Sequence, residues 1–128
     1  MRLCIAGSRY FFNKEEIFKI IDCYYSLETG LPSQVLCGCA KGVDQIGALW
    51  AEQHKIPIRF FPANWKKWGN YAGPKRNEEM AALANEVLVI RIEDSKGSLT
   101  MIGASHDRGR LVHDIVIPKR LYPLYEEK

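Results

Sequence analysis

Apolar runs of strand type alternate with segments of helical periodicity, and this order limits the fold more than any other feature of the chain. The strand-type runs span residues 2–6, 34–38, 57–61, 86–92 and 111–117. Their apolar residues are nearly continuous, as strands buried on both faces require. Helices between successive strands are crossover connections, so the strands should run parallel. The sequence therefore predicts an α/β fold.

We expect a single Rossmann-like domain over residues 1–128, with a sheet of about five parallel strands and helices on both faces. The strands at 2–6 and 86–92 should be neighbours at the centre of the sheet, because they flank the point where strand order reverses. Asn13 can cap the first helix, with Glu16 three residues later and an apolar stripe after it. The later helices are predicted at residues 43–54, from about 74 to 83, and at 99–107.

Composition excludes several classes of protein. Hydrophobic residues make up 47% of the chain and charged residues 26%, which is typical of a globular protein and not of a disordered one. No apolar run approaches the roughly 18 residues of a membrane helix. The apolar stretch at residues 1–7 is too short for the core of a signal peptide. We therefore expect a cytoplasmic protein with no membrane partner.

Neither the cysteines nor the charges indicate a special partner. The four cysteines form no C-x-x-C pair, and the three histidines lie far from them in sequence. Because a zinc site needs paired ligands at fixed spacing, we expect reduced thiols, no metal ion and no cofactor. The formal net charge is +3, and the basic residues are scattered. Nucleic-acid-binding domains usually have clustered basic charge, so the sequence does not favour nucleic acid as the partner, although it leaves that alternative open.

The loop after the first strand is a candidate site. In parallel α/β sheets, ligands bind beyond the carboxyl ends of the strands, where the strand order reverses. The first strand is followed by Gly7, Ser8 and Arg9. Glycine permits a sharp turn, serine offers a hydroxyl, and arginine offers a planar fork for phosphate.

Two further loops have the composition of phosphate-binding turns. Gly38 and Gly42 follow the second strand and lead into a helix, and Gly97 and Ser98 open the last helix. Backbone N–H groups at a helix N-terminus can face an anion. Asp44 has two interpretations: a helix-start residue that interacts favourably with the dipole, or a contact for a ligand hydroxyl.

The third junction is long and aromatic. Trp65, Trp68 and Tyr71 could stack on a base or only pack the loop; we favour packing for Trp68 and leave Trp65 open as a ligand contact. Arg76 falls in the expected first turn of the third helix, where a cation is mildly unfavourable, so we expect it to bind an anion. The alternative is a surface ion pair with Glu79.

These motifs, taken in order, resemble a family. The sequence G-S-R, then G-x-A-x-G-x-D, then W-x-x-x-G-x-x-A-G-P-x-R-N-x-x-M, resembles a small bacterial and phage branch of the SLOG superfamily. That superfamily includes the lonely-guy phosphoribohydrolases, a DNA-processing protein, and sensors of ADP-ribose-derived signals. The resemblance implies a Rossmann-like fold that binds nucleotides or their derivatives. The ligand-contacting residues that it implies are Gly7, Ser8, Arg9, Gly38, Gly42, Asp44, Gly73, Arg76, Asn77, Gly97 and Ser98.

The chain departs from the family pattern at three positions. Asn64 precedes Trp65 where the branch often has aspartate, and Ser98 replaces a threonine while keeping the hydroxyl. Met101 occupies the position of the glutamate that assists glycosidic cleavage in the phosphoribohydrolases, and methionine cannot transfer a proton. The sequence thus leaves catalysis uncertain and names no catalytic residue.

Three functions follow as hypotheses. The first is sensing or sequestration of a nucleotide or nucleotide-derived ligand, such as an ADP-ribose-like molecule, by a homo-oligomer. The second is an enzyme, a nucleotide N-glycosidase or phosphohydrolase that uses another carboxylate such as Asp44 or Asp94. The third is single-stranded DNA binding, which would weaken steeply with salt.

Overall fold

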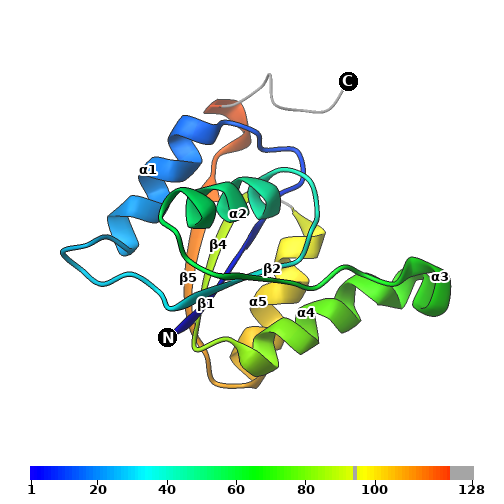
Figure 1. Cartoon of the computed structure of the whole chain (residues 1–128). Helices are drawn as coiled ribbons and strands as arrows, with labels where there is room; N and C mark the ends of the chain where they lie inside the picture. The colour runs from blue at the N-terminus through cyan, green and yellow to red at the C-terminus, as the bar shows by residue number, and fades with distance from the viewer. Residues whose placement is uncertain (94, 122–128) are drawn as a thin grey trace.

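A single parallel sheet forms the centre of the molecule (Figure 1). The computed structural model describes residues 1–93 and 95–121. The strands are β1 (Arg2–Gly7), β2 (Gln34–Cys37), β3 (Ile58–Phe60), β4 (Glu86–Ile92) and β5 (Leu111–Ile117). They lie in the order β3-β2-β1-β4-β5, and each adjacent pair is parallel. The predicted Rossmann-like α/β fold is confirmed, with β1 at the centre and β4 beside it.

The helices connect the strands as expected, with shifts at their ends. They are α1 (Lys14–Tyr24), α2 (Val43–Gln53), α3 (Trp65–Trp68), α4 (Ala72–Leu83) and α5 (Lys96–Asp107), with short 3-10 helices η1 (Gly69–Tyr71) and η2 (Lys119–Leu121). The predicted cap of α1 is present, since the Asn13 side chain accepts the Glu16 N–H. In the described part of the chain, no helix is both long enough and apolar enough to cross a membrane.

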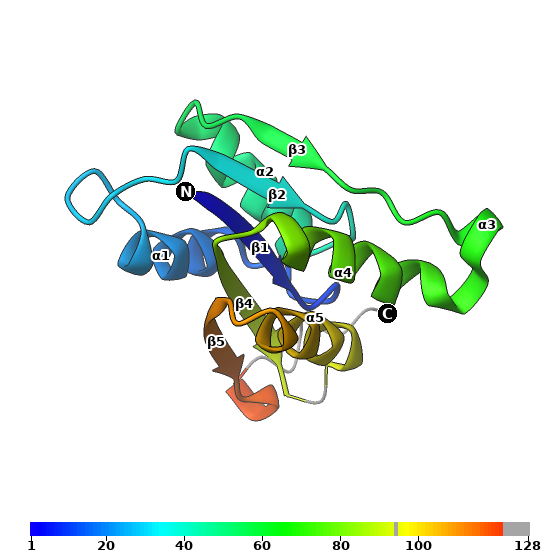
Figure 2. The ribbon, with the colours of Figure 1, turned by 90° about the horizontal axis from the view of Figure 1, so that it is seen from below.

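Alternate residues of β1 enter two separate apolar layers. Leu3 and Ile5 pack in a cluster with residues of α1 and α2, including the fully buried Trp50. Cys4 and Ala6 point the other way, into a cluster formed with α4 and α5. Figure 2 shows the sheet between these two helical layers. This alternation is what a strand covered on both faces requires.

The expectation of burial on both faces is wrong for the two edge strands. In β3, Arg59 and Phe60 are exposed, and Phe60 keeps 57% of its surface accessible. In β5 only Ile117 is buried. The helices pack mainly over the inner strands β2, β1 and β4, so the outer strands are less covered. An apolar run indicates a strand but does not show whether the strand is central.

Candidate functional site

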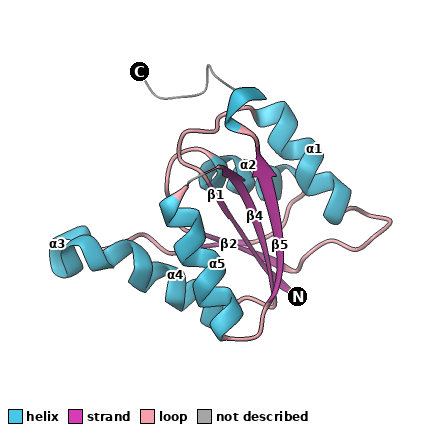
Figure 3. Ribbon diagram, turned by 180° about the vertical axis from the view of Figure 1, so that it is seen from behind, coloured by secondary structure: helices cyan, strands magenta, loops and turns pink. Residues whose placement is uncertain are grey.

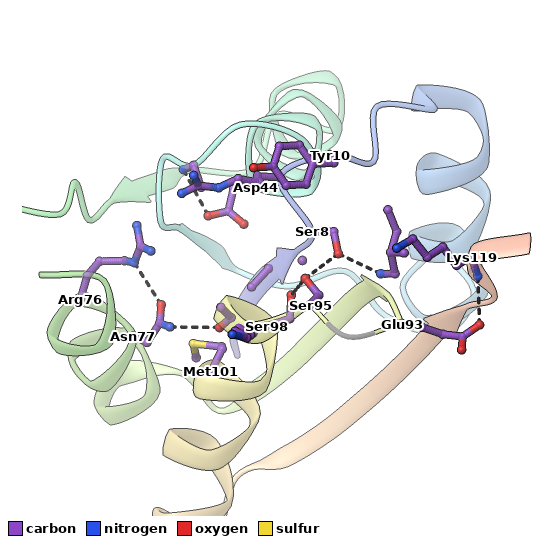
Figure 4. Close-up of a pocket in the computed structure, with 17 residues that line it drawn as sticks. Ser8, Tyr10, Asp44, Arg76, Asn77, Glu93, Ser95, Ser98, Met101 and Lys119 are labelled. Atoms are coloured by element: carbon purple, nitrogen blue, oxygen red, sulfur yellow. Dashed lines mark hydrogen bonds between the residues drawn. The ribbon is translucent and has the colours of Figure 1, made fainter. Parts of the chain in front are cut away.

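A pocket of about 890 Å³ opens at the carboxyl ends of β1 and β4. This is the point where strand order reverses. From β1, the chain adds β2 and β3 on one side of the sheet, and it then adds β4 and β5 on the other side of β1. Loops after β1, β2, β4 and β5 contribute to its wall, together with α4 and the first turn of α5 (Figure 4). The pocket therefore lies where ligands bind in open α/β sheets.

Most of the residues expected at the site line this pocket. They are Gly7, Ser8, Arg9, Asp44, Arg76, Asn77, Gly97 and Ser98. Among the described residues, the pocket lining does not include Gly38, Gly42, Trp65 or Gly73. Gly38 and Gly42 lie behind the residues that line the pocket. Trp65 lies on α3 and Gly73 lies near the start of α4.

Gly38 and Gly42 shape the wall without lining it. Gly42 has φ 74°, and a Cβ there would collide with the Ser8 carbonyl oxygen. A Cβ on Gly38 would lie 2.7 Å from the Asp44 carboxylate, and the Gly38 carbonyl accepts a hydrogen bond from Arg76 Nη1. Both positions need glycine because neighbouring chain segments approach closely there.

Trp65 lies outside the pocket, on α3. Its side chain is 52% exposed, and the tip of its ring lies 3.2 Å from the position of a Cβ on Gly73. Trp68 is 40% exposed and packs within the loop against Tyr71, with the two ring centroids 6.4 Å apart. Asn64 caps α3, because its side chain accepts the Lys67 N–H at 3.0 Å. The departure at Asn64 therefore keeps the role of a helix cap.

Three serine hydroxyls form a chain across the floor of the pocket. Ser8 Oγ accepts the Ile92 N–H at 2.8 Å and donates to Ser95 Oγ at 2.7 Å, and Ser95 Oγ lies 3.2 Å from Ser98 Oγ. Ser8 and Ser98 are both buried. The chain joins the end of β1 to the start of α5.

The first turn of α5 lines the pocket. The first N–H groups of an α-helix have no partner inside the helix. In α5 they belong to Lys96, Gly97 and Ser98, which all line the pocket. The helix dipole adds partial positive charge there, so this end of the pocket favours an anion.

Asp44 is a buried carboxyl group in the wall of the pocket. Its side chain is 5% exposed, and its Oδ2 accepts the Ala40 N–H at 3.3 Å. Burial raises the pKa of Asp44 to about 6, while the positive charges of Arg76 and Arg9 and backbone hydrogen bonds act in the opposite direction. A carboxyl group with such a pKa can change its protonation state near neutral pH.

Arg76 points across the pocket wall and not along the surface of α4. Its Nε donates to Asn77 Oδ1 at 3.0 Å, and Asn77 Nδ2 in turn donates to Gly97 O at 3.5 Å. The expected alternative, a pair with Glu79, is made by Lys75 instead, at 3.9 Å. The argument that placed Arg76 in the first helical turn is wrong, since α4 begins at Ala72.

The pocket also contains residues that the sequence did not single out. Tyr10, Ser95 and Lys96 line it, as do Glu93 and Lys119. Glu93 Oε1 accepts a hydrogen bond from the backbone N–H of Lys119 at 2.9 Å, and this bond connects the end of β4 to the segment after β5. Tyr10 directly follows the G-S-R motif, so extending that motif by one residue would have found it. Lys119 carries no local signal, because only the sheet topology brings it to the pocket.

Met101 lines the deep part of the pocket and is 1% exposed. It packs in the same apolar cluster as Cys4, Met80 and Val89. Within the described residues, no group of three or more histidine, cysteine or acidic side chains is arranged to hold a metal ion.

Comparison with known proteins identifies the family. The YAcAr model, described as the YspA, cpYpsA-related SLOG family, matches residues 1–68. The chain belongs to this SLOG family. The matched segment spans β1 to α3 and contains the G-S-R motif and the loop before Asp44. The resemblance expected from the motifs is therefore confirmed.

A solved structure shares the fold of this SLOG protein. The X-ray structure of DNA processing protein A (DprA) from Streptococcus pneumoniae superposes with a TM-score of 0.66 at 23% identity. The match covers 88% of the SLOG chain and 49% of the other, so the chain spans about half the length of that protein. At this identity the likeness establishes the Rossmann-like fold alone. A search of curated proteins found no match.

Proposed function

We propose that the pocket binds a nucleotide or a nucleotide-derived ligand, such as an ADP-ribose-like molecule, for sensing or sequestration. The observation that carries the proposal is that one cavity contains both hydrogen-bond donors suited to an anion and a buried hydrogen-bond acceptor. Arg76 and the first turn of α5 face the same space as the Asp44 carboxyl group. The volume of about 890 Å³ falls within the range of small-molecule sites.

Each part of such a ligand has a complementary group. The α5 N–H groups, the Ser98 hydroxyl and the two arginines suit phosphate oxygens, because charge-assisted hydrogen bonds are the stronger ones. Asp44 can accept a hydrogen bond from a ribose hydroxyl. Tyr10, which is 41% exposed and lines the pocket, offers an aromatic face to a base.

Titration calorimetry with AMP, ADP, ADP-ribose and NAD tests the proposal. At least one should bind, and Arg76→Ala should weaken it by about ten- to a hundredfold, the effect of losing a charge-assisted contact. Lys75→Ala is a matched control, because Lys75 is the neighbouring cation and pairs with Glu79 outside the pocket lining. Equal affinity in the wild type and both variants would disprove the assignment of the site. Native mass spectrometry of the purified protein would show any retained ligand and test the expected homo-oligomer.

The buried Asp44 keeps the enzyme hypothesis as a second candidate, whereas Asp94, the other carboxylate considered for it, lies outside the described residues. With a pKa of about 6, the Asp44 carboxyl group is suited to exchange a proton near neutral pH, as general acid–base catalysis requires. Met101 argues against the phosphoribohydrolase mechanism, because it occupies the expected glutamate position. Chromatography of the same nucleotides after incubation separates the two: a sensor returns them intact, and an N-glycosidase releases the free base.

A further inference from the structure

Two cysteines meet at the end of β2, next to the pocket wall. Cys37 is the last residue of the strand and is buried, whereas Cys39, two residues later, is exposed. Cys37 Sγ accepts the Cys39 N–H at 3.4 Å, and the Cys39 thiol donates to the Cys37 carbonyl oxygen at 3.7 Å. A side-chain hydrogen bond also links the two thiols. The two sulfur atoms therefore lie beside each other in the fold.

The spacing of these cysteines suits a disulfide bond. Cα atoms at positions i and i+2 lie at most about 7 Å apart, and a disulfide usually joins Cα atoms separated by about 4.4 to 6.8 Å. Gly38, between the cysteines, has no side chain, so its backbone can adapt to a closed ring. Cys39 has φ 66°, a left-handed conformation that is uncommon for cysteine, so the chain already turns sharply at the exposed thiol. A bond between Cys37 and Cys39 is compatible with this turn.

The two thiols differ in the way that an oxidation site requires. Burial raises the pKa of Cys37 to about 12, so Cys37 stays a protonated thiol and is shielded from solvent. Cys39 is exposed, so an oxidant reaches it first. Oxidation-sensitive cysteines are accessible to solvent and often have a second cysteine beside them that attacks the first oxidation product. Cys39 and Cys37 fit these two roles.

The turn from Cys37 to Cys39 connects the two helical layers at the pocket. α2 and α4 lie on opposite faces of the sheet (Figure 3). The Cys37 thiol donates to the backbone carbonyl of Asp44 on α2, and the Gly38 carbonyl accepts a hydrogen bond from Arg76 Nη1 on α4. A disulfide would remove the first of these bonds, because Cys37 Sγ loses its proton. It would also change the torsion angles at Gly38 and so turn the acceptor of the second bond.

We propose that Cys37 and Cys39 form a disulfide when the protein meets a hydroperoxide, and that this bond displaces the Gly38 carbonyl that holds Arg76. First, Cys39 Sγ attacks as the thiolate on one oxygen of the peroxide. The O–O bond breaks, the other oxygen takes up the proton that Cys39 released and leaves as an alcohol or water, and Cys39 becomes a sulfenic acid. Cys37 Sγ then attacks Cys39 Sγ, and the departing hydroxide takes the Cys37 proton to form water. The two sulfurs lose two electrons, which reduce the peroxide.

Mass spectrometry of the Cys23→Ser protein after treatment with hydrogen peroxide tests the formation of the bond. Cys23 is exposed on α1 and lies in the same tryptic peptide, residues 20–41, so its replacement leaves Cys37 and Cys39 as the only thiols of that peptide. The peptide should lose about 2 Da, the mass of two hydrogens, and dithiothreitol should restore it. In Cys23→Ser/Cys37→Ser, Cys39 should stop at the sulfenic acid and react with dimedone. The proposal is overturned if the Cys23→Ser peptide keeps both thiols, or if it gains oxygen without forming the bond.

The Nε–H resonance of Arg76 reports the effect on the pocket wall. In a nitrogen–proton correlation spectrum, this resonance is assigned by its absence from Arg76→Lys. Oxidation of Cys23→Ser should shift it, and the same treatment of Cys23→Ser/Cys39→Ser, which cannot form the bond, should leave it in place. Arg110, whose Nε donates to Ala81 O at 3.0 Å outside the pocket lining, is the internal control and should not move. A disulfide that leaves the Arg76 resonance unchanged would refute the link to the pocket. Because no ligand is added, this measurement is independent of the proposed nucleotide binding.

Discussion

Replacing Asp44 with asparagine should stabilise the ligand-free protein at neutral pH. Burial raises the pKa of Asp44 from 3.8 to about 6, and the nearby arginines reduce this effect without cancelling it. The difference corresponds to about 3 kcal/mol, because each tenfold change in a protonation equilibrium is worth about 1.4 kcal/mol. Asparagine removes the charge and keeps an oxygen that can accept the Ala40 N–H. About 3 kcal/mol is therefore the upper limit of the expected gain.

The sign of the effect depends on pH. Well below pH 3.8 the Asp44 carboxyl group is protonated in both states and contributes nothing to the pH dependence of stability. Between 3.8 and about 6 the unfolded chain releases its proton first, so the free energy of unfolding of the wild type falls as pH rises. Above a pH of about 6, the reduction in the free energy of unfolding of the wild type no longer changes with pH. The advantage of Asp44→Asn should therefore be absent in acid, grow through the window and be largest at neutral pH.

Urea unfolding of both proteins from about pH 4 to pH 7 measures this difference directly. Asp107→Asn, at an exposed position at the end of α5, is the control and should follow the wild type. Parallel stability curves for wild type and Asp44→Asn would refute the reasoning, as would a variant that is less stable at neutral pH. If Asp44 also accepts a ligand hydroxyl, the stabilised variant should bind the ligand more weakly. Such a trade-off is expected where a group that destabilises the fold is kept for its function.

Three further outcomes are expected. Arg9→Ala should weaken ligand binding in calorimetry. Arg76→Lys should not fully restore the affinity that Arg76→Ala loses, because lysine lacks the planar fork of arginine. Full rescue by lysine would contradict binding through two N–H groups of Arg76. The wild type should release no adenine from AMP by chromatography, because Met101 cannot transfer a proton. Met101→Glu should lower the free energy of unfolding by about 3 kcal/mol or more, because it buries a carboxyl group in an apolar cluster, whereas Met101→Leu should cost under about 1.5 kcal/mol. Gly42→Ala should destabilise the protein by more than about 1 kcal/mol in urea unfolding, because its Cβ would meet the Ser8 carbonyl.

The sheet could be predicted from the sequence because its signal is local and repeated. Each strand has its own apolar run, and the intervening helices force parallel pairing, so the placement of β1 beside β4 followed from general rules. Exposure of the edge strands did not follow. Phe60 belongs to an apolar run that Arg59 interrupts, and the helical layers do not extend far enough to cover it.

The site could be predicted in part, for a similar reason. Ser8 and Gly97 lie in a turn and a helix start with recognisable chemistry, and the topology gathers such positions at one sheet edge. Arg76 lies beyond the first turn of α4, so the argument that selected it does not account for its place. Lys119 has no such local signal. The short helix α3 was not predicted, because four residues are too few to show helical periodicity.

The strand order also determines when the pocket can form. β1 pairs with β2 about 30 residues later, but its other neighbour, β4, is about 80 residues away, with Leu3 opposite Glu86. Contacts at such separation carry a large loop-closure entropy and form slowly. During synthesis, β1 must wait with one unpaired edge until β4 has been made. The cavity therefore exists only in the finished fold, and any ligand that binds it selects that state alone and shifts the folding equilibrium toward it.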